Sequence, residues 1–153
     1  MATRRHTTDR DLGLRRFIRE LQVARVTEVV VGVHQGDANA TGQQIAEYAA
    51  HNEFGTENAP ERSFMRSAFD ENLNDLSADM DRRYSQVVAG TKTVYQALGL
   101  VGLRHQDQIK KKIDTNVPPS NAPATIAAKG SSHTLIDTAA MKNSIHYIIR
   151  RNT

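Results

Sequence analysis

The sequence predicts an α+β fold in a single domain, residues 1–153, with a small β-sheet flanked by helices that include one long helix. Three observations predict this class. Residues 26–34, VTEVVVGVH, are dense in β-branched side chains, which is typical of a buried strand. Apolar side chains recur at helical spacing over residues 61–88, and residues 145–150 alternate in the manner of a second strand. A chain of this length fits one domain with one core.

The N-terminal segment, residues 1–25, predicts a basic amphipathic helix near residues 9–24. Thr7, Thr8 and Asp9 offer side-chain caps, and the apolar residues that follow are spaced as on one face of a helix. Two interpretations are open: a surface helix packed on the core, which we favour, or an arm that contacts nucleic acid. In the second case the candidate DNA contacts are Arg4, Arg5, Arg15, Arg16 and Arg19.

The next part of the chain is divided by loop and helix-end signals. Residues 36–41, GDANAT, form a loop, and Thr41 can cap a helix that carries Ile45, Tyr48 and Ala49. That helix stops at Gly55. Pro60 is a start signal for the long helix over residues 61–88, which ends or bends at residues 89–91.

A further helix runs from Val94 to Ile113, with its apolar residues on one face. Gly99 and Gly102 inside it cost about 1 kcal/mol each relative to Ala. We therefore expect a neighbouring backbone to approach the helix closely there, although a locally weak helix held by tertiary contacts is the alternative.

Residues 115–134 hold three of the four prolines and predict an extended Pro/Ala-rich loop or arm. We favour an arm that reaches a neighbouring subunit over a surface loop. Asp137 or Thr138 then caps a short helical turn before the final strand. Because two strands alone make no independently stable sheet, we expect the rest of the sheet from loop segments or from another chain.

The corner between the second and third predicted helices lies within residues 45–69, IAEYAAHNEFGTENAPERSFMRSAF. It carries two aromatic residues, Phe54 and Phe64, with Arg62 between them. A surface that is apolar and charged at once is typical of a contact surface rather than of a plain connector.

This corner resembles the tail-completion and neck proteins of tailed bacteriophages, of the virion-morphogenesis type. Their usual run is Glu-Phe-Gly, a short spacer, then Pro-x-Arg-Pro-Phe-x-Arg and small residues that open a long helix. Ser63 stands where the family has its second proline. The matching positions are Glu53, Phe54, Gly55, Pro60, Arg62, Phe64, Arg66 and Ala68.

A second stretch, residues 135–145, LIDTAAMKNSI, is similar to the C-terminal signature of the same family, Leu-Ile-Asp-Thr-Gly, one helical turn, then Asn-Ser-Ile. Ala139 stands where the family usually has Gly, so a positive φ at this position would carry a cost from the Cβ atom. The two stretches occur in the family's order, and the resemblance spans roughly residues 26–151.

The resemblance implies a structural virion protein that is made in the host bacterial cytoplasm and closes a ring, most often of six copies, at the neck or the top of the tail. Its partners would be copies of itself, other neck, connector and tail-tube proteins, and packaged DNA passing through the lumen. Phe54 and Phe64 would be buried at the corner, Arg62 and Arg66 would pair with acids of the corner or of the adjacent subunit, and Asp137 would fix the last turn. An intradomain role is equally open for the candidate interface residues, which are Glu53, Phe54, Arg62, Phe64, Arg66, Asp137 and Thr138.

Charge is unevenly spread along the chain. Residues 1–25, 26–90 and 91–153 carry +4, −7 and +6, which sum to the net charge of +3. Three interpretations are open: a monomer neutralised internally, a nucleic-acid binder, or a subunit whose basic side meets the acidic side of its neighbour.

Catalytic, metal and cofactor sites are not indicated. The chain has no Cys, its six His are scattered without metal spacing, and no nucleophile elbow, Walker loop or dinucleotide fingerprint occurs. No apolar stretch is long enough to span a bilayer. We therefore expect no enzyme, no cofactor and no membrane contact, and the alternative function is sequence-nonspecific DNA binding through the Arg-rich N-terminus.

Overall fold

The computed structural model describes residues 11–34, 44–135 and 139–152, which fold as helices around a two-stranded antiparallel sheet. The predicted α+β class, a small sheet flanked by helices, is confirmed. No helix of the described residues is long and apolar enough to cross a membrane. In chain order the elements are α1 (Leu14–Ala24), β1 (Thr27–Val33), α2 (Ile45–Phe54), α3 (Met65–Glu71), α4 (Leu73–Val88), α5 (Val94–Asp114), α6 (Pro123–Lys129), α7 (Ala140–Ser144) and β2 (Ile145–Arg151).

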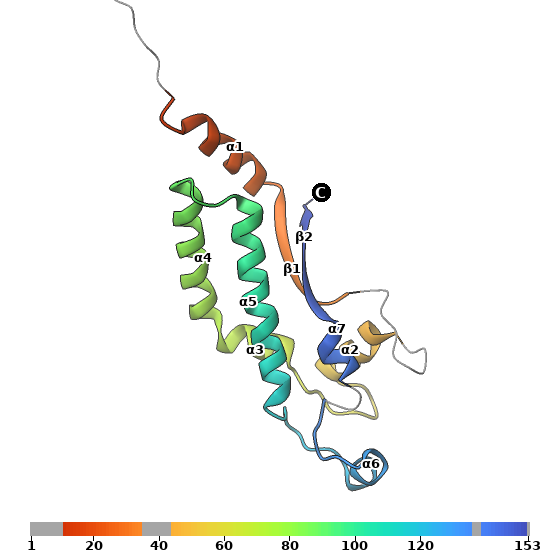
Figure 1. The fold of residues 1–153 in the computed structure, drawn as a ribbon. Helices are drawn as coiled ribbons and strands as arrows, with labels where there is room; N and C mark the ends of the chain where they lie inside the picture. Colours follow the sequence, from red (N-terminus) through yellow and green to blue (C-terminus); the bar gives the residue numbers. More distant parts are fainter. Residues whose placement is uncertain (1–10, 35–43, 136–138, 153) are drawn as a thin grey trace, which may run out of the picture.

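The two strands pair along their whole length, from Thr27 opposite Arg151 to Val33 opposite Ile145. No loop segment of the described chain adds a further strand, which corrects one of the two sources expected from the sequence, while a strand from another chain stays a prediction. Instead α5 lies along one face of the ribbon, and α4 lies on the far side of α5 (Figure 1). Packing against a helix therefore supplies the stability that two strands lack.

The core gathers where α2, α3 and α7 meet the second half of α5 and the adjoining ends of the strands. Its fully buried apolar side chains include Phe64, Ile109, Ile113 and Ile145. From this core the molecule extends in two directions, with α1 at one end and α6 at the other (Figure 1).

The long helix predicted over residues 61–88 is wrong in two respects. It begins only at Met65, and it is divided into α3 and α4 at Asn72, whose φ of −111° and ψ of 10° leave the helical range. The Asn72 side-chain amide donates to the Ala68 carbonyl at 2.8 Å. Such local bonding by Asn competes with regular helix hydrogen bonding, so the chain bends here.

Residues 115–134 are more ordered than the extended arm expected from the sequence. They contain α6, which starts at Pro123 and stops at Gly130 in the left-handed conformation. The two ends of the segment are joined, because Thr134 donates to the Asn116 side chain and to the Val117 carbonyl. The segment is therefore a closed loop with its own helix, for which Pro123 and Gly130 were the sequence signals.

Candidate functional site

Glu53, in the last turn of α2, is the centre of the corner and is only 1% exposed. Its carboxylate accepts hydrogen bonds from the backbone N–H groups of Phe64, Met65 and Arg66 at 2.8, 2.9 and 3.0 Å, and from the Ser63 hydroxyl at 2.9 Å. These N–H groups open α3, which has no local side-chain cap. Glu53 thus caps α3 from a different helix and satisfies donors that would otherwise lack partners.

Arg66 completes this cluster and confirms the predicted pairing with acids of the corner. Its guanidinium donates to the Glu53 carboxylate at 3.0 Å and to Glu61 at 2.6 Å. Burial alone would raise the pKa of the Glu53 carboxyl, but the hydrogen bonds from the backbone and from Arg66 outweigh it, so this pKa lies below its ordinary value. The bond to Glu53, assisted by Glu61, raises the pKa of Arg66.

The two corner aromatics differ in burial. Phe64 is completely buried, as predicted. Phe54 is 63% exposed, so its predicted burial is wrong. The buried positions of α2 are Ile45, Ala49 and Glu53, spaced four apart, and Phe54 follows one step around the helix from that stripe. Its ring instead lies 4.9 Å from the Arg66 guanidinium in a cation–π contact at the surface.

Arg62 lies in the corner but pairs with no corner acid, which corrects that part of the sequence prediction, while pairing with an acid of an adjacent subunit stays a prediction. It is 8% exposed and donates through Nε to the Pro119 carbonyl at 2.8 Å and through Nη2 to the Ser120 carbonyl at 3.3 Å. A third bond of 3.3 Å reaches Oδ1 of Asn121. No carboxylate of the described residues lies within 4.0 Å of its guanidinium. Arg62 therefore joins the corner to the loop before α6.

The other predicted site residues either lie on α1 or fall outside the described residues. Arg15, Arg16 and Arg19 are exposed on α1, which starts at Leu14 rather than near residue 9. Arg4, Arg5, Asp137 and Thr138 fall outside the described residues, as do the proposed caps at residues 7–9. Ala139 has a φ of 58°, so the positive φ that the family's Gly would accommodate is present here on an Ala.

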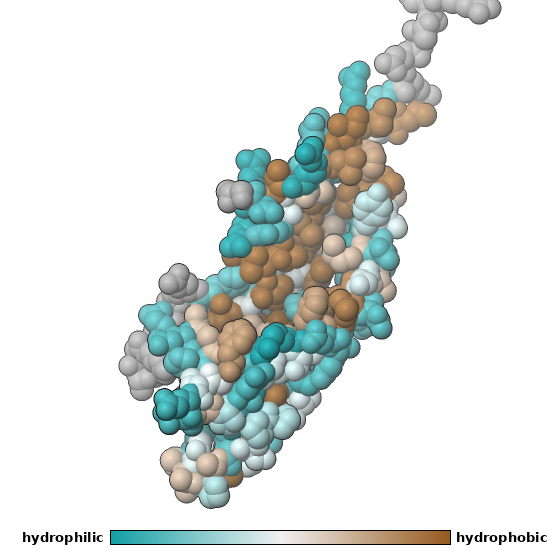
Figure 2. Space-filling view, turned by 180° about the vertical axis from the view of Figure 1, so that it is seen from behind, coloured by the Kyte–Doolittle hydropathy of each residue, from teal (hydrophilic) through white to brown (hydrophobic). Residues whose placement is uncertain are grey.

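An exposed apolar surface, which the sequence analysis did not predict, extends over α1, α4 and α5. No residue of α1 is buried, and its apolar face includes Leu14 at 65% exposure and Ile18 at 46%. A cleft of about 120 Å³ lies between the three helices, and almost all of its lining is apolar. Figure 2 shows apolar side chains continuing from α1 down the body on this side. In the sequence, the helical spacing of the apolar residues of α1 is the feature that could have predicted this surface. Cleft-lining side chains include Phe17, Leu21, Met80, Tyr84 and Leu98.

The uneven charge along the chain is partly neutralised within the fold. Asp75 pairs with Arg104 at 3.0 Å, and Glu28 pairs with Arg150 at 2.7 Å. Glu71 with Lys112, and Asp114 with Lys142, make two further pairs between elements. The pairs of Glu28, Glu71 and Asp75 join the acidic middle segment to the basic C-terminal segment, whereas Asp114 and Lys142 both belong to the latter. This geometry favours the first of the three interpretations, internal neutralisation, for part of the acidic middle segment.

The titratable groups of the described residues do not form a metal site, since no group of three or more His, Asp or Glu side chains is close enough to hold an ion. The rings of His34 and His146 lie 4.3 Å apart between centroids and are tilted by 43°, with His34 Nε2 3.0 Å from the His146 carbonyl oxygen. Burial of His105 lowers the pKa of its imidazole.

Comparison with protein-family models, curated proteins and solved structures gave no match for this chain. The resemblance to phage neck proteins therefore depends on the two sequence segments alone. What the geometry adds is a connected corner, a recessed Arg62 and an uncovered apolar surface along α1.

Proposed function

We propose that the chain is a structural, non-enzymatic subunit of a tailed-phage particle, which closes a ring with copies of itself at the neck or the top of the tail. The two family-like segments support the phage assignment. The observation that carries the self-association is that α1 buries no residue while it exposes an apolar face.

A helix of 11 residues is marginal in water unless one of its faces is packed. Here the apolar face of α1 is continuous with the apolar cleft against α4 and α5, so a second molecule can cover both at once. A closed ring needs two different complementary surfaces on each subunit, and this apolar surface would be one of them.

We expect the purified protein to form a particle of uniform mass that is a whole multiple of the chain mass in light scattering after size exclusion. Replacing Leu14 and Ile18 together by Gln should shift that mass to the monomer. Because both side chains are exposed, the free energy of unfolding of the monomer should change by no more than about 0.5 kcal/mol per site.

The matched control is Arg15→Gln with Arg19→Gln, which changes the opposite, polar face of α1 and should leave the mass unchanged. A wild-type protein that stays monomeric up to high micromolar concentration, or a Leu14/Ile18 variant that associates as well as the wild type, would contradict the proposal.

Nonspecific DNA binding is the second candidate, because Arg16 and Arg19 are exposed on α1 and have no ion-pair partner within the described residues. In that case the monomer would bind duplex DNA with an affinity that falls steeply with salt. The arginine control variant would then lose DNA affinity, and the Leu14/Ile18 variant would keep it.

A further inference from the structure

A cleft of about 460 Å³, with a lining that is partly polar and partly apolar, opens on the opposite end of the molecule from α1, between the corner and the loop that carries α6. This volume is within the range of ligand pockets. Its lining combines peptide groups, amides and hydroxyls, and none of the described residues that line it is acidic. Its polar side chains include Asn52, Asn58, Arg62, Thr125 and Lys129.

Arg62 brings a positive charge into this cleft that no carboxylate of the described residues balances. Its three acceptors are amide oxygens, from two backbone carbonyls and one Asn side chain. These bonds satisfy guanidinium N–H donors, but they do not neutralise the positive charge of Arg62. A bound anion stabilises a recessed cation more than an exposed one, because water screens their attraction less. Nη1 of Arg62 makes no hydrogen bond within the described residues, so its two protons are available to a ligand.

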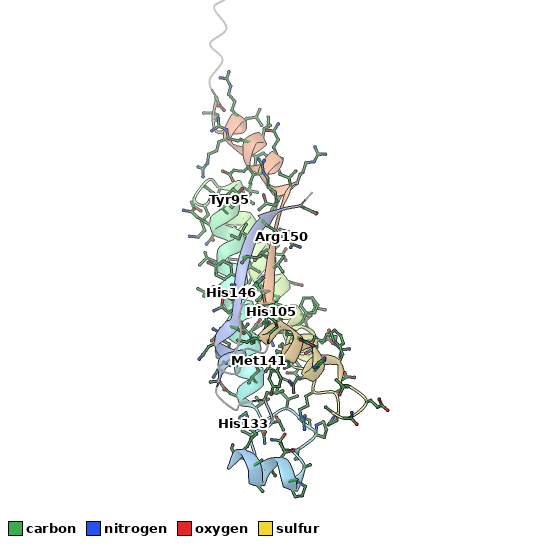
Figure 3. The ribbon with its side chains drawn as sticks, turned by 90° about the vertical axis from the view of Figure 1, so that its right-hand side faces the viewer. Tyr95, His105, His133, Met141, His146 and Arg150 are labelled. Carbon is green, nitrogen blue, oxygen red and sulfur yellow. The ribbon has the colours of Figure 1, made fainter. Side chains whose placement is uncertain are left out.

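Lys129 adds a second cation to the same lining. Its ammonium donates to the His133 carbonyl at 2.8 Å, which leaves two of its three protons for another acceptor. Figure 3 shows His133 close to α6 at this end of the molecule. An anion bound in the cleft would be attracted by both positive charges.

We propose that this cleft binds the carboxylate of an Asp or Glu side chain from a partner polypeptide. The two protons of Arg62 Nη1 can donate to a carboxylate in a charge-assisted bond, and the flanking amides of Asn52 and Asn58 can pair with a peptide backbone. Duplex DNA fits less well, since it is bound by rows of cations on an open surface rather than by a recessed pair. This inference rests on the proposed function, which identifies the partner as a protein of the phage particle.

The probe is N-acetyl-aspartate N-methylamide, followed by ligand-observed NMR, which works for both a monomer and a large ring. We expect binding in the millimolar range, with the corresponding asparagine amide at least about threefold weaker. Lys129→Gln should weaken binding of the aspartate probe about threefold to tenfold, and Lys111→Gln, an exposed lysine paired with Asp107 and absent from the cleft, should leave it unchanged. Thermal unfolding of both variants shows that they are folded.

The measurement is made on wild type and on the monomeric Leu14/Ile18 variant. Binding to the monomer but not to the ring supports the proposal, because a neighbour then occupies the cleft. Equal signals for the aspartate and asparagine probes, or no effect of Lys129→Gln, would overturn it. Tighter binding of inorganic phosphate would overturn it in favour of a nucleic-acid ligand. Probe binding and particle mass are measured separately. A wild-type protein that is monomeric but still binds the probe would therefore contradict the ring and not the carboxylate site.

Discussion

Glu53→Gln is expected to lower the free energy of unfolding by about 1–3 kcal/mol, the cost of leaving a buried hydrogen-bond donor without its acceptor. The carboxylate is 1% exposed and receives donors from Ser63, from the backbone that opens α3 and from Arg66. A Gln side chain places an NH2 group where donors converge, so at least one buried donor loses its acceptor. Urea denaturation of both proteins measures the difference.

Glu61→Gln is the matched control, because it removes the other carboxylate that contacts the same Arg66. Glu61 is 53% exposed, and exposed ion pairs contribute about 0–1 kcal/mol. The change at residue 61 should therefore have a small effect. If the free energy of unfolding falls by the same amount in both variants, the capping of α3 by Glu53 is not the main contribution to the stability of the corner.

The pH dependence of stability checks the same cluster independently. Since the pKa of Glu53 in the folded chain lies below its ordinary value of 4.5, its ionised form stabilises the fold above that pH. This contribution should be lost as the pH falls below about 4.5 toward the folded-state pKa. Wild type should therefore lose stability more steeply than Glu53→Gln over that interval in acid titrations followed by circular dichroism. Parallel acid curves would contradict the assignment.

Local patterns predicted the strands, α5 and the corner, because β-branched runs and helical spacing are properties of short segments. The break at Asn72 was hidden, since the apolar spacing continues across it from Phe69 to Leu73 and Leu76. The aromatic character of Phe54 predicts burial, but its position one residue past the buried stripe of α2 places it at the surface. Capping of α3 by Glu53 and the partners of Arg62 depend on how distant segments meet, which no local pattern contains.

Gly102→Ala is expected to lower the free energy of unfolding by about 1–3 kcal/mol, although Ala is the better helix former. An added Cβ would lie 2.7 Å from Val29 Cγ2 and 2.8 and 2.9 Å from Cγ and Cβ of Tyr147. The close neighbour is thus the side chains of the ribbon rather than the backbone expected from the sequence. Tyr147 Cβ is fixed to β2, so the clash can be relieved only by moving the ribbon away from α5.

Gly99→Ala provides the comparison, one turn earlier on the same helix. There the added Cβ would be 3.6 Å from the Tyr147 hydroxyl and 3.7 Å from Ile149 Cδ1, which are ordinary contacts. Helix propensity then decides, and the variant should gain about 0.5–1 kcal/mol. Opposite signs in urea denaturation would establish that α5 presses on the two-stranded ribbon at Gly102. A gain at both positions would mean that the ribbon sits farther from α5, and that its stability has another source.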